Sequence, residues 1–314
     1  MLDGIHTATL IFNPAAGRLR NHGAERLAEA MRIFRDAGIE MDLRATDAPG
    51  SATTLARAAV QHGLQLVIVC GGDGTLNEVV NGMAGSNVPL GLLPAGTANV
   101  LAKELGLRWS IPRAAAQLVR GRLQRIALGQ AVAENAPEPA GQTPAAPRYF
   151  ISLAGAGVDA DMIRRVHDGI KQRTGILAYW LAGIQQLLEY DYPMFRARSA
   201  ERELNAAFLC VGRTRAHGFP VNITTGANLF EDRFELAAFT YRNSWAFLAS
   251  GLAAFFGRLR RSRSAHFWKT SELRMDAVNG ARILFQVDGE LMGSLPVTFR
   301  IVPDSLTLVV PESS

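Results

Sequence analysis

The chain has 314 residues, enough for two packed domains, and its 48% hydrophobic and 19% charged content is typical of a globular protein with a core. A net charge of +5 favours an anionic partner such as phosphate, a membrane surface or nucleic acid. The first residues lack the pattern of a signal peptide, and the longest apolar segment, 245–256, is shorter than the roughly 20 residues of a spanning helix, so no membrane span is expected.

The two cysteines, Cys70 and Cys210, are too few for a disulfide framework of the secreted kind. Each lies in an apolar, strand-like run, so both are expected to be buried and reduced. A cytosolic location follows from this expectation.

The first 120 residues alternate apolar runs with amphipathic segments. The expected strands are 7–12, 40–45, 66–70 and 89–93, and the expected helices are 25–37, 51–62, one starting near 75, and 97–105. Strand–helix alternation with continuously apolar strands predicts an α/β domain built on a parallel, doubly wound sheet.

After residue 120 the pattern changes to one of mostly strands. They are expected at 123–133, 148–153, 195–199, 206–211, 234–241, 273–276, 282–287, 297–302 and 305–310, with a Pro- and Ala-rich surface loop before 148 and a helical stretch at 159–188 that breaks near 171–174. Consecutive strands predict an antiparallel β-sandwich. We therefore expect an α/β domain at 1–122 and a sandwich domain at 123–302, with 303–314 available to pack back on the first.

The strongest local signal is Gly71-Gly72-Asp73-Gly74-Thr75, which follows the strand LVIVC and opens a helix. Glycines let the backbone approach a phosphate closely, and a helix start offers unpaired N–H groups to an anion. A carboxylate such as Asp73 is repulsive there unless it holds Mg²⁺ or a hydroxyl. A strand–helix turn without a ligand is the alternative, and three glycines in four positions argue against it. The chain contains no G-K-[ST], so the turn is not a Walker A loop.

Two further turns follow expected strand ends: Asn13-Pro14-Ala15-Ala16-Gly17 and LPAGTAN, which contains Gly96 and Thr97. In a parallel sheet all three turns emerge at the carboxyl edge, where ligands bind, so together they predict a nucleotide site. Thr75 and Glu78 also have the spacing of a capping box, with Thr75 as N-cap. For Glu78 the capping role and a catalytic role stand as equal alternatives.

NPAAG, GGDGTLNEVVNG and LPAGTAN, in this order and spacing, resemble the catalytic domain of the diacylglycerol kinase family, which includes sphingosine kinases, ceramide kinases and soluble bacterial lipid kinases. The resemblance continues through GAGVDA at 155–160 to VDGE at 287–290 and covers nearly the whole chain. GGDGT alone is shared with NAD kinases and phosphofructokinases, whereas NEVVNG and NPxxG point to lipid kinases. The resemblance implies ATP-dependent phosphate transfer to a hydroxyl of a membrane lipid, in a cleft between a nucleotide domain and a β-sandwich domain.

The resemblance also implies roles for single residues. ATP would be bound by Asn13, Gly17, Gly71, Gly72, Gly74, Thr75, Glu78, Gly96 and Thr97. Asp288 would be the general base that takes the proton of the lipid hydroxyl, with Glu290 assisting near the phosphates and Asp73 at the catalytic Mg²⁺. From the residues alone, Asp288-Gly289 is better interpreted as an ordinary hairpin turn, and the resemblance reverses that preference.

Two positions depart from the family pattern. Val100 follows Asn99 where members often have Asp, and Glu231-Asp232-Arg233 stands where many have Asp-Gly. Carboxylates at both positions are linked in some members to a structural Mg²⁺, so the sequence leaves a second metal site open.

The segment 244–264 runs from an apolar stretch into Arg258, Arg260, Arg261 and Arg263. It suits a helix in the bilayer interface, with arginines toward anionic headgroups; a core helix with a solvated basic end is the alternative. We expect a cytosolic lipid kinase that binds the inner face of the membrane peripherally.

Other functions remain as alternatives: an NAD kinase-like enzyme with a soluble substrate, and a non-catalytic nucleotide- or lipid-binding regulator, against which Asp73 and Asp288 argue. Nucleic acid is not expected, because the basic residues are not interleaved with stacking aromatics. The sequence leaves open which lipid is used (diacylglycerol, ceramide, a sphingoid base or phosphatidylglycerol) and whether the chain is a homodimer.

Overall fold

The computed structural model describes residues 2, 4–134, 147–169, 190–215, 222–241 and 243–312. Its first part is a parallel sheet with the spatial order β2 (Glu40–Ala45), β1 (Thr7–Phe12), β3 (Leu66–Gly71) and β4 (Pro89–Pro94). Every residue of β3 and β4 is buried, which is why these strands are continuously apolar.

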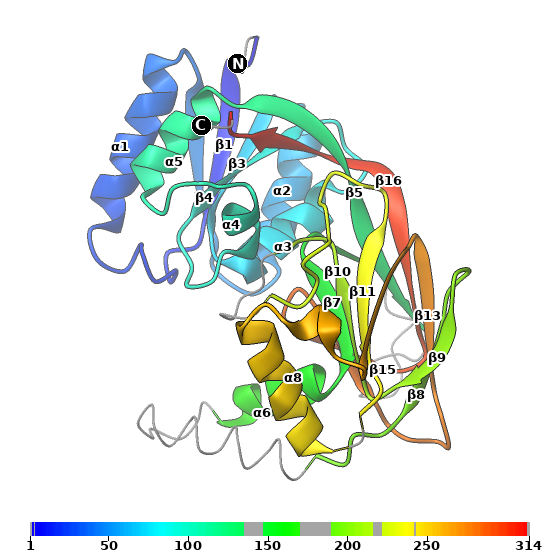
Figure 1. Ribbon diagram of the computed structural model, residues 1–314. Helices are drawn as coiled ribbons and strands as arrows, with labels where there is room; N and C mark the ends of the chain where they lie inside the picture. The colour runs from blue at the N-terminus through cyan, green and yellow to red at the C-terminus, as the bar shows by residue number, and fades with distance from the viewer. Residues whose placement is uncertain are drawn as a thin grey trace.

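Helices cover both faces of this sheet (Figure 1). They are α1 (Gly23–Asp36), α2 (Ser51–Gln61), α3 (Asp73–Met83), α4 (Val100–Glu104) and α5 (Ile111–Val119). α1 packs with α5 on one face, and α2 packs with α3 on the other. The doubly wound α/β prediction is confirmed.

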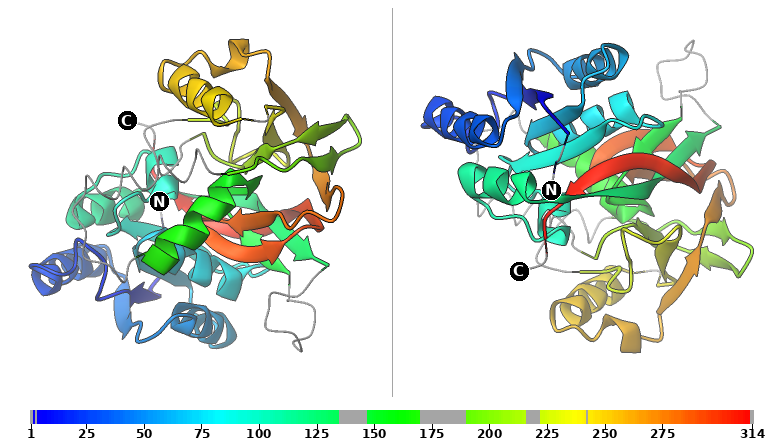
Figure 2. Two further views of the ribbon diagram at one scale, coloured as in Figure 1. Left: turned by 90° about the horizontal axis from the view of Figure 1, so that it is seen from below. Right: turned by 90° about the horizontal axis from the view of Figure 1, so that it is seen from above.

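Two long antiparallel strands, β5 (Arg122–Ala133) and β16 (Val297–Val310), run side by side from the parallel sheet into the second part of the molecule (Figure 2). β16 pairs in parallel with β4 at Thr307 and Leu308, and at its other end in antiparallel fashion with β13 (Glu272–Ala277). One ten-stranded sheet therefore passes through both parts. Because the sheet is continuous, the division at 122/123 stays a prediction.

A second, antiparallel sheet of six strands completes the sandwich. Its spatial order is β12 (Ala265–Thr270), β11 (Phe234–Phe239), β10 (Phe208–Gly212), β7 (Leu153–Gly157), β14 (Leu284–Val287) and β15 (Glu290–Ser294). The remaining strands, β6 (Arg148–Phe150), β8 (Phe195–Arg198) and β9 (Glu203–Ala206), belong to the ten-stranded sheet. Between the sheets Phe150 stacks on Phe234 and meets Phe299 edge-on. The predicted antiparallel sandwich is confirmed.

Two helices, α6 (Val158–Gly169) and α8 (Ser244–Phe255), and a 3₁₀ turn at Leu259–Arg261 belong to the second part, next to the six-stranded sheet (Figure 1). Phe247 of α8 packs on Phe208 of β10, which fixes the helix to the sheet. Both cysteines are buried thiols, as expected. None of the described helices is long and apolar enough to span a bilayer.

Several boundaries differ from the predictions. Helix α4 begins at Val100 rather than near residue 97, because Asn99 adopts a left-handed conformation (φ 42°) and ends the turn before it. Residues 297–310 form one strand with an irregularity between Val302 and Leu306, where two strands were expected. Of the helix expected at 159–188, the part up to 169 is confirmed, and its remainder lies outside the described residues.

The helix at 111–119 and the strands at 153–157, 203–206, 265–270 and 290–294 were not predicted. The sequence LAGAG of β7 lacks the branched and aromatic residues that favour strands. It pairs because its small, mostly buried residues fit between β10 and β14, which is a property of the tertiary structure.

Candidate active site

The Asp288-Gly289 turn lies against the first turns of α3, the helix that the glycine turn opens. Both residues have positive φ (47° and 84°), so the turn has the conformation of a tight β14–β15 hairpin. Its carboxylate points away from solvent, and Asn77 Nδ2 on α3 donates to Asp288 Oδ2 at 2.8 Å. The hairpin interpretation and the site interpretation of Asp288 are therefore both compatible with the same geometry.

Asp288 is held by four donors. Besides Asn77, the backbone N–H groups of Ile151, Ser152 and Leu153 donate to its carboxylate at 2.9–3.0 Å. Burial raises the pKa of Asp288 above its ordinary value, and the four hydrogen bonds oppose that rise. A carboxylate accepts about four hydrogen bonds. One donor must therefore move away before Asp288 can accept a proton.

Two asparagines of α3, neither of which was assigned a role from the sequence, hold this region together. Asn77 Nδ2 also lies 3.2 Å from Tyr149 O, while Asn81 donates to that carbonyl and accepts from Tyr149 N. Residues four apart lie on one face of a helix, so the spacing of the two asparagines in NEVVNG was the available signal. They attach α3 to β6, which leads into the residues that surround Asp288.

Glu290, at the start of β15, lies close to Gly74 of the glycine turn. A Cβ placed on Gly74 would lie 3.7 Å from Glu290 Oε1, and Arg148 Nη2 pairs with Glu290 Oε2 at 2.7 Å. Burial raises the pKa of Glu290, the carboxylates of Glu78 and Asp288 add to that rise, and Arg148 opposes it. Arg148 is thus a cation beside the predicted phosphate site that the sequence analysis did not single out.

Asp73 connects the second glycine turn with the third. Its two carboxylate oxygens accept the backbone N–H groups of Asn99 and Val100 at 2.8 and 2.7 Å, at the start of α4. Burial raises the pKa of Asp73, although the two backbone hydrogen bonds and the charge of Lys103 lower it. Each oxygen keeps acceptor capacity for a cation.

Glu78 does not form the predicted capping box. Helix α3 begins at Asp73 with Gly72 as its N-cap, so Thr75 lies inside the helix rather than before it. Glu78 instead accepts the N–H groups of Gly50 and Ala52 at 2.9 and 3.1 Å. These donors belong to the start of α2, so Glu78 caps a neighbouring helix from α3.

The glycines of the two central turns have different roles. A Cβ on Gly96 would lie 2.5 Å from Gly72 Cα, and one on Gly71 would lie 2.7 Å from Thr75 Cβ. Ala95 and Gly96 both donate their N–H to Gly71 O. Gly96 therefore lets the two turns pack on each other, and Gly71 lets Thr75 fold back over its own turn, whereas Gly74 is exposed and has only Glu290 near its Cβ position.

Gly74 borders a cavity of about 460 Å³ at the carboxyl edge of the parallel sheet. Asn13, Thr75 and Glu78 also line it, and Asn13 Nδ2 donates to Thr75 Oγ1 at 3.3 Å. The structure thus brings together the first and second turns, as predicted. Gly17 and Thr97 are exposed residues of the first and third turns and do not line this cavity.

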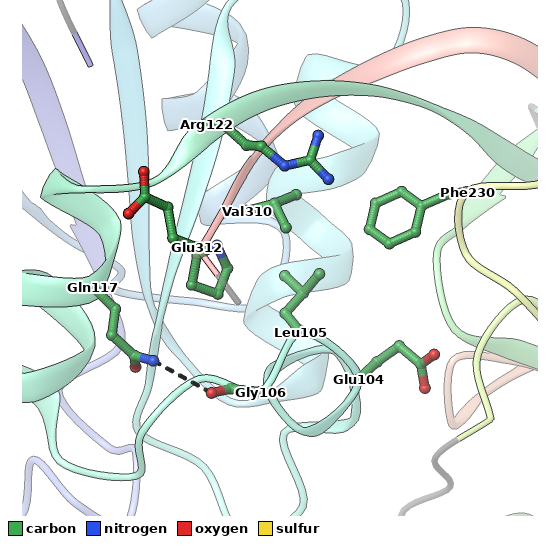
Figure 3. A pocket seen from close by; sticks show the side chains of 9 residues that line it. Glu104, Leu105, Gly106, Gln117, Arg122, Phe230, Val310 and Glu312 are labelled. Carbon is green, nitrogen blue, oxygen red and sulfur yellow. Dashed lines mark hydrogen bonds between the residues drawn. The ribbon is translucent and has the colours of Figure 1, made fainter. Parts of the chain in front are cut away.

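A second hollow, of about 310 Å³, lies between the end of α4, the C-terminal residues and Phe230 (Figure 3). Glu104, Arg122 and Val310 are among its lining residues, and none of the glycine turns reaches it. Within the part of the chain that the structure describes, no group of three or more His, Cys, Asp or Glu side chains is arranged to hold a metal ion.

Comparisons with known proteins agree with this arrangement. The family model "Diacylglycerol kinase catalytic domain" matches residues 7–131, and the model "YegS C-terminal NAD kinase beta sandwich-like domain" matches residues 152–310. The chain belongs to the diacylglycerol kinase family. The predicted lipid kinase family is thereby confirmed.

Relatives match this family member from end to end. The diacylglycerol kinase of Bacillus subtilis (strain 168) is 29% identical, over 97% of this chain and 96% of its own. That of Staphylococcus saprophyticus is 26% identical, over 97% and 95%. A diacylglycerol kinase crystal structure from Bacillus anthracis (strain Sterne) has the same fold, with a TM-score of 0.71, 16% identity and 98% of each chain covered.

Proposed function

We propose that this family member transfers the γ-phosphate of ATP to a hydroxyl of a membrane lipid. The observation that carries the proposal is the contact between VDGE and the helix that the glycine turn opens. Asp288 accepts a hydrogen bond from Asn77 on α3, and Glu290 lies near Gly74 at the start of the same helix. A proton acceptor therefore stands beside backbone suited to phosphate.

In this proposal ATP lies over the carboxyl edge of the parallel sheet. Asn13, Gly74 and Thr75 border the cavity there. No side chain caps the first N–H groups of α3, so these groups are available to bind an anion. Gly17, Gly71, Gly72, Gly96 and Thr97 shape the turns around it. Glu78 contributes by fixing α2 beside the cavity.

The group transfer uses the carboxylate of the hairpin. The lipid hydroxyl oxygen forms a bond to Pγ, the bond between Pγ and the β,γ-bridging oxygen breaks, and ADP leaves with that electron pair. The hydroxyl proton passes to Asp288, whose raised pKa suits a general base. Asn77 is the donor best able to release Asp288, because its amide has a second acceptor in Tyr149 O.

The site fits Mg²⁺ bound together with ATP. Asp73 keeps acceptor capacity beside the glycine turn, and Glu290 adds a second carboxylate near Gly74. When bound, Mg²⁺ supplies charge neutralisation of the phosphates.

A membrane surface is the second part of the proposal. Trp245, Leu252, Phe255 and Phe256 on and after α8 have 61–74% of their surface exposed, an unusual amount for large apolar side chains. Exposed Arg258, Arg261 and Arg263 follow directly. Aromatic side chains next to arginines suit the interface of an anionic bilayer, here the inner face of the cytoplasmic membrane.

An NAD kinase-like activity is the alternative, because the matched sandwich model carries that name in its description. One enzyme preparation is given labelled ATP and Mg²⁺ with each acceptor: NAD, or diacylglycerol, ceramide, a sphingoid base or phosphatidylglycerol in mixed micelles. We expect a labelled lipid and no labelled dinucleotide. Transfer to NAD without any lipid product would refute the proposal.

A further inference from the structure

Arg213 is a fully buried arginine at the place where the two halves of the protein meet. Its guanidinium donates to four backbone carbonyls. Nη2 donates to Ala127 O at 2.9 Å and to Leu229 O at 2.7 Å, and Nη1 donates to Arg233 O at 3.2 Å and to Glu231 O. Burial lowers the pKa of Arg213 to about 10, so the side chain stays protonated at neutral pH.

The four carbonyls come from segments that join the halves. Ala127 lies in β5, the strand that runs through both, and the other three lie in the loop 229–233 before β11. Leu229 packs in the core of the α/β half, whereas Phe234, directly after the loop, packs between the two sheets. Phe230 of the same loop borders the second hollow (Figure 3). The guanidinium thus fixes a loop that is anchored in both cores.

A buried charge is tolerated only with a full set of hydrogen bonds or nearby counter-charges. The four carbonyls accept from Nη1 and Nη2, whereas the buried Nε has no hydrogen-bond partner among the described residues. Asp232 and Glu231 lie close enough to favour the charged form of Arg213. Such a group of converging oxygens is also what a hard divalent cation binds. With a guanidinium already among them, a second cation would be repelled.

The residues here therefore do not fit the structural Mg²⁺ that the family resemblance left open. The segment 231–233 is one of the two positions concerned, and its carbonyls face Arg213. At the other position, the side chain of Val100 is apolar and its N–H is given to Asp73.

We propose that the Arg213 guanidinium is the resident cation of this junction, in place of a structural divalent ion. It holds the loop 229–233 against β5 whatever the metal content of the surroundings. The backbone of Arg213 also connects this junction with the candidate active site, because Arg213 N donates to Ser152 O at 2.8 Å and Ser152 N donates to Asp288.

The test is thermal melting of the nucleotide-free protein, purified with Mg²⁺ and then measured with and without a chelator. Wild type is compared with Arg213→Gln and with Arg233→Gln as the matched control. The control removes the same charge from an exposed side chain of the loop 229–233 itself and leaves the carbonyl of Arg233 in place. No catalytic activity is needed, so failure here is distinct from failure of the lipid kinase proposal.

We expect the Tm of wild type and of Arg233→Gln to be the same with and without the chelator. Arg213→Gln should melt at least about 5 °C lower, because several charge-assisted hydrogen bonds are lost. A chelator-dependent fall in the wild-type Tm would overturn the proposal, as would Arg213→Gln melting together with the control. If Arg213→Gln does not fold, the wild-type Tm with and without the chelator decides alone: an unchanged Tm supports the proposal, and a lower Tm with the chelator overturns it.

Discussion

Asn77 and Asp288 are 211 positions apart in the chain, yet Asn77 Nδ2 donates to Asp288 Oδ2 at 2.8 Å. This hydrogen bond connects the helix opened by the glycine turn with the hairpin of the second half. Together with three backbone N–H groups it occupies the acceptor capacity of the carboxylate. The bond both places Asp288 and limits its ability to accept a proton.

Asp288→Asn should lower kcat by a factor on the order of 10² or more, the usual scale for loss of a general base. ATP affinity should change little, because Asp288 does not line the cavity beside Gly74. The Tm should fall, because the NH₂ group of the new amide would point at N–H groups that now donate to the carboxylate. Steady-state kinetics with a lipid substrate measure the first effect, and near-normal turnover would remove Asp288 from this role.

Asn77→Ala removes a donor that lowers the pKa of Asp288. The pKa of the carboxyl should therefore rise, and a base that must be deprotonated should lose activity at a higher pH than in wild type. A pH–rate profile of kcat measures this as a shift of the acidic limb toward neutral pH. An unshifted limb in an active, folded variant would show that Asn77 does not control the titration of Asp288.

Glu78→Ala should act on stability more than on chemistry, because both carboxylate oxygens cap the start of α2. Loss of a helix cap costs about 1–2 kcal/mol, so the free energy of unfolding in urea should fall by that amount. Glu78→Gln keeps one acceptor oxygen and should lose less. A large loss of kcat with unchanged unfolding would instead support the catalytic alternative for Glu78.

Gly74→Val and Gly96→Ala form a contrasting pair. Within 4 Å, the Cβ at Gly74 would meet only the carboxylate of Glu290, so the protein should fold while the branched side chain blocks phosphate. The Cβ at Gly96 would overlap Gly72 Cα, so that variant should lose stability. Calorimetric titration with ATP and thermal melting separate the two effects. ATP binding by Gly74→Val at wild-type affinity would exclude this turn from the nucleotide site.

The membrane prediction concerns Arg258, Arg261 and Arg263. Arg260 is left unchanged, because it pairs with the buried Glu235 and stacks on Phe267. Changing the three exposed arginines to Glu should weaken binding to anionic vesicles, since each basic residue near the surface contributes about 1 kcal/mol.

The matched control changes Arg32, Arg35 and Arg57 to Glu, with the same change of net charge on exposed positions of α1 and α2. Sedimentation with phosphatidylglycerol vesicles at low and high salt measures the difference, and salt should weaken wild-type binding. Equal binding by both variants would mean that the segment after α8 is not the membrane contact.

The amino-acid sequence was sufficient to predict the features that depend on local pattern. Continuous apolar runs indicated the buried strands of the parallel sheet, and the turns expected after residues 12, 70 and 93 marked its carboxyl edge. It could not define β7, whose LAGAG has little strand propensity and pairs only because its neighbours are already placed. Local spacing also suggested a capping box for Glu78, which in the fold caps the helix beside it.

Which distant groups meet could be learned only from the packed fold. The contact of Asn77 with Asp288, and the four carbonyls around Arg213, join residues that no periodicity relates. Arg213 shows the reason most clearly. In sequence it is one of many arginines in a basic chain, and only burial turns its charge into a requirement for hydrogen-bond partners. Burial is a property of the whole packed molecule, which is why local pattern could not predict it.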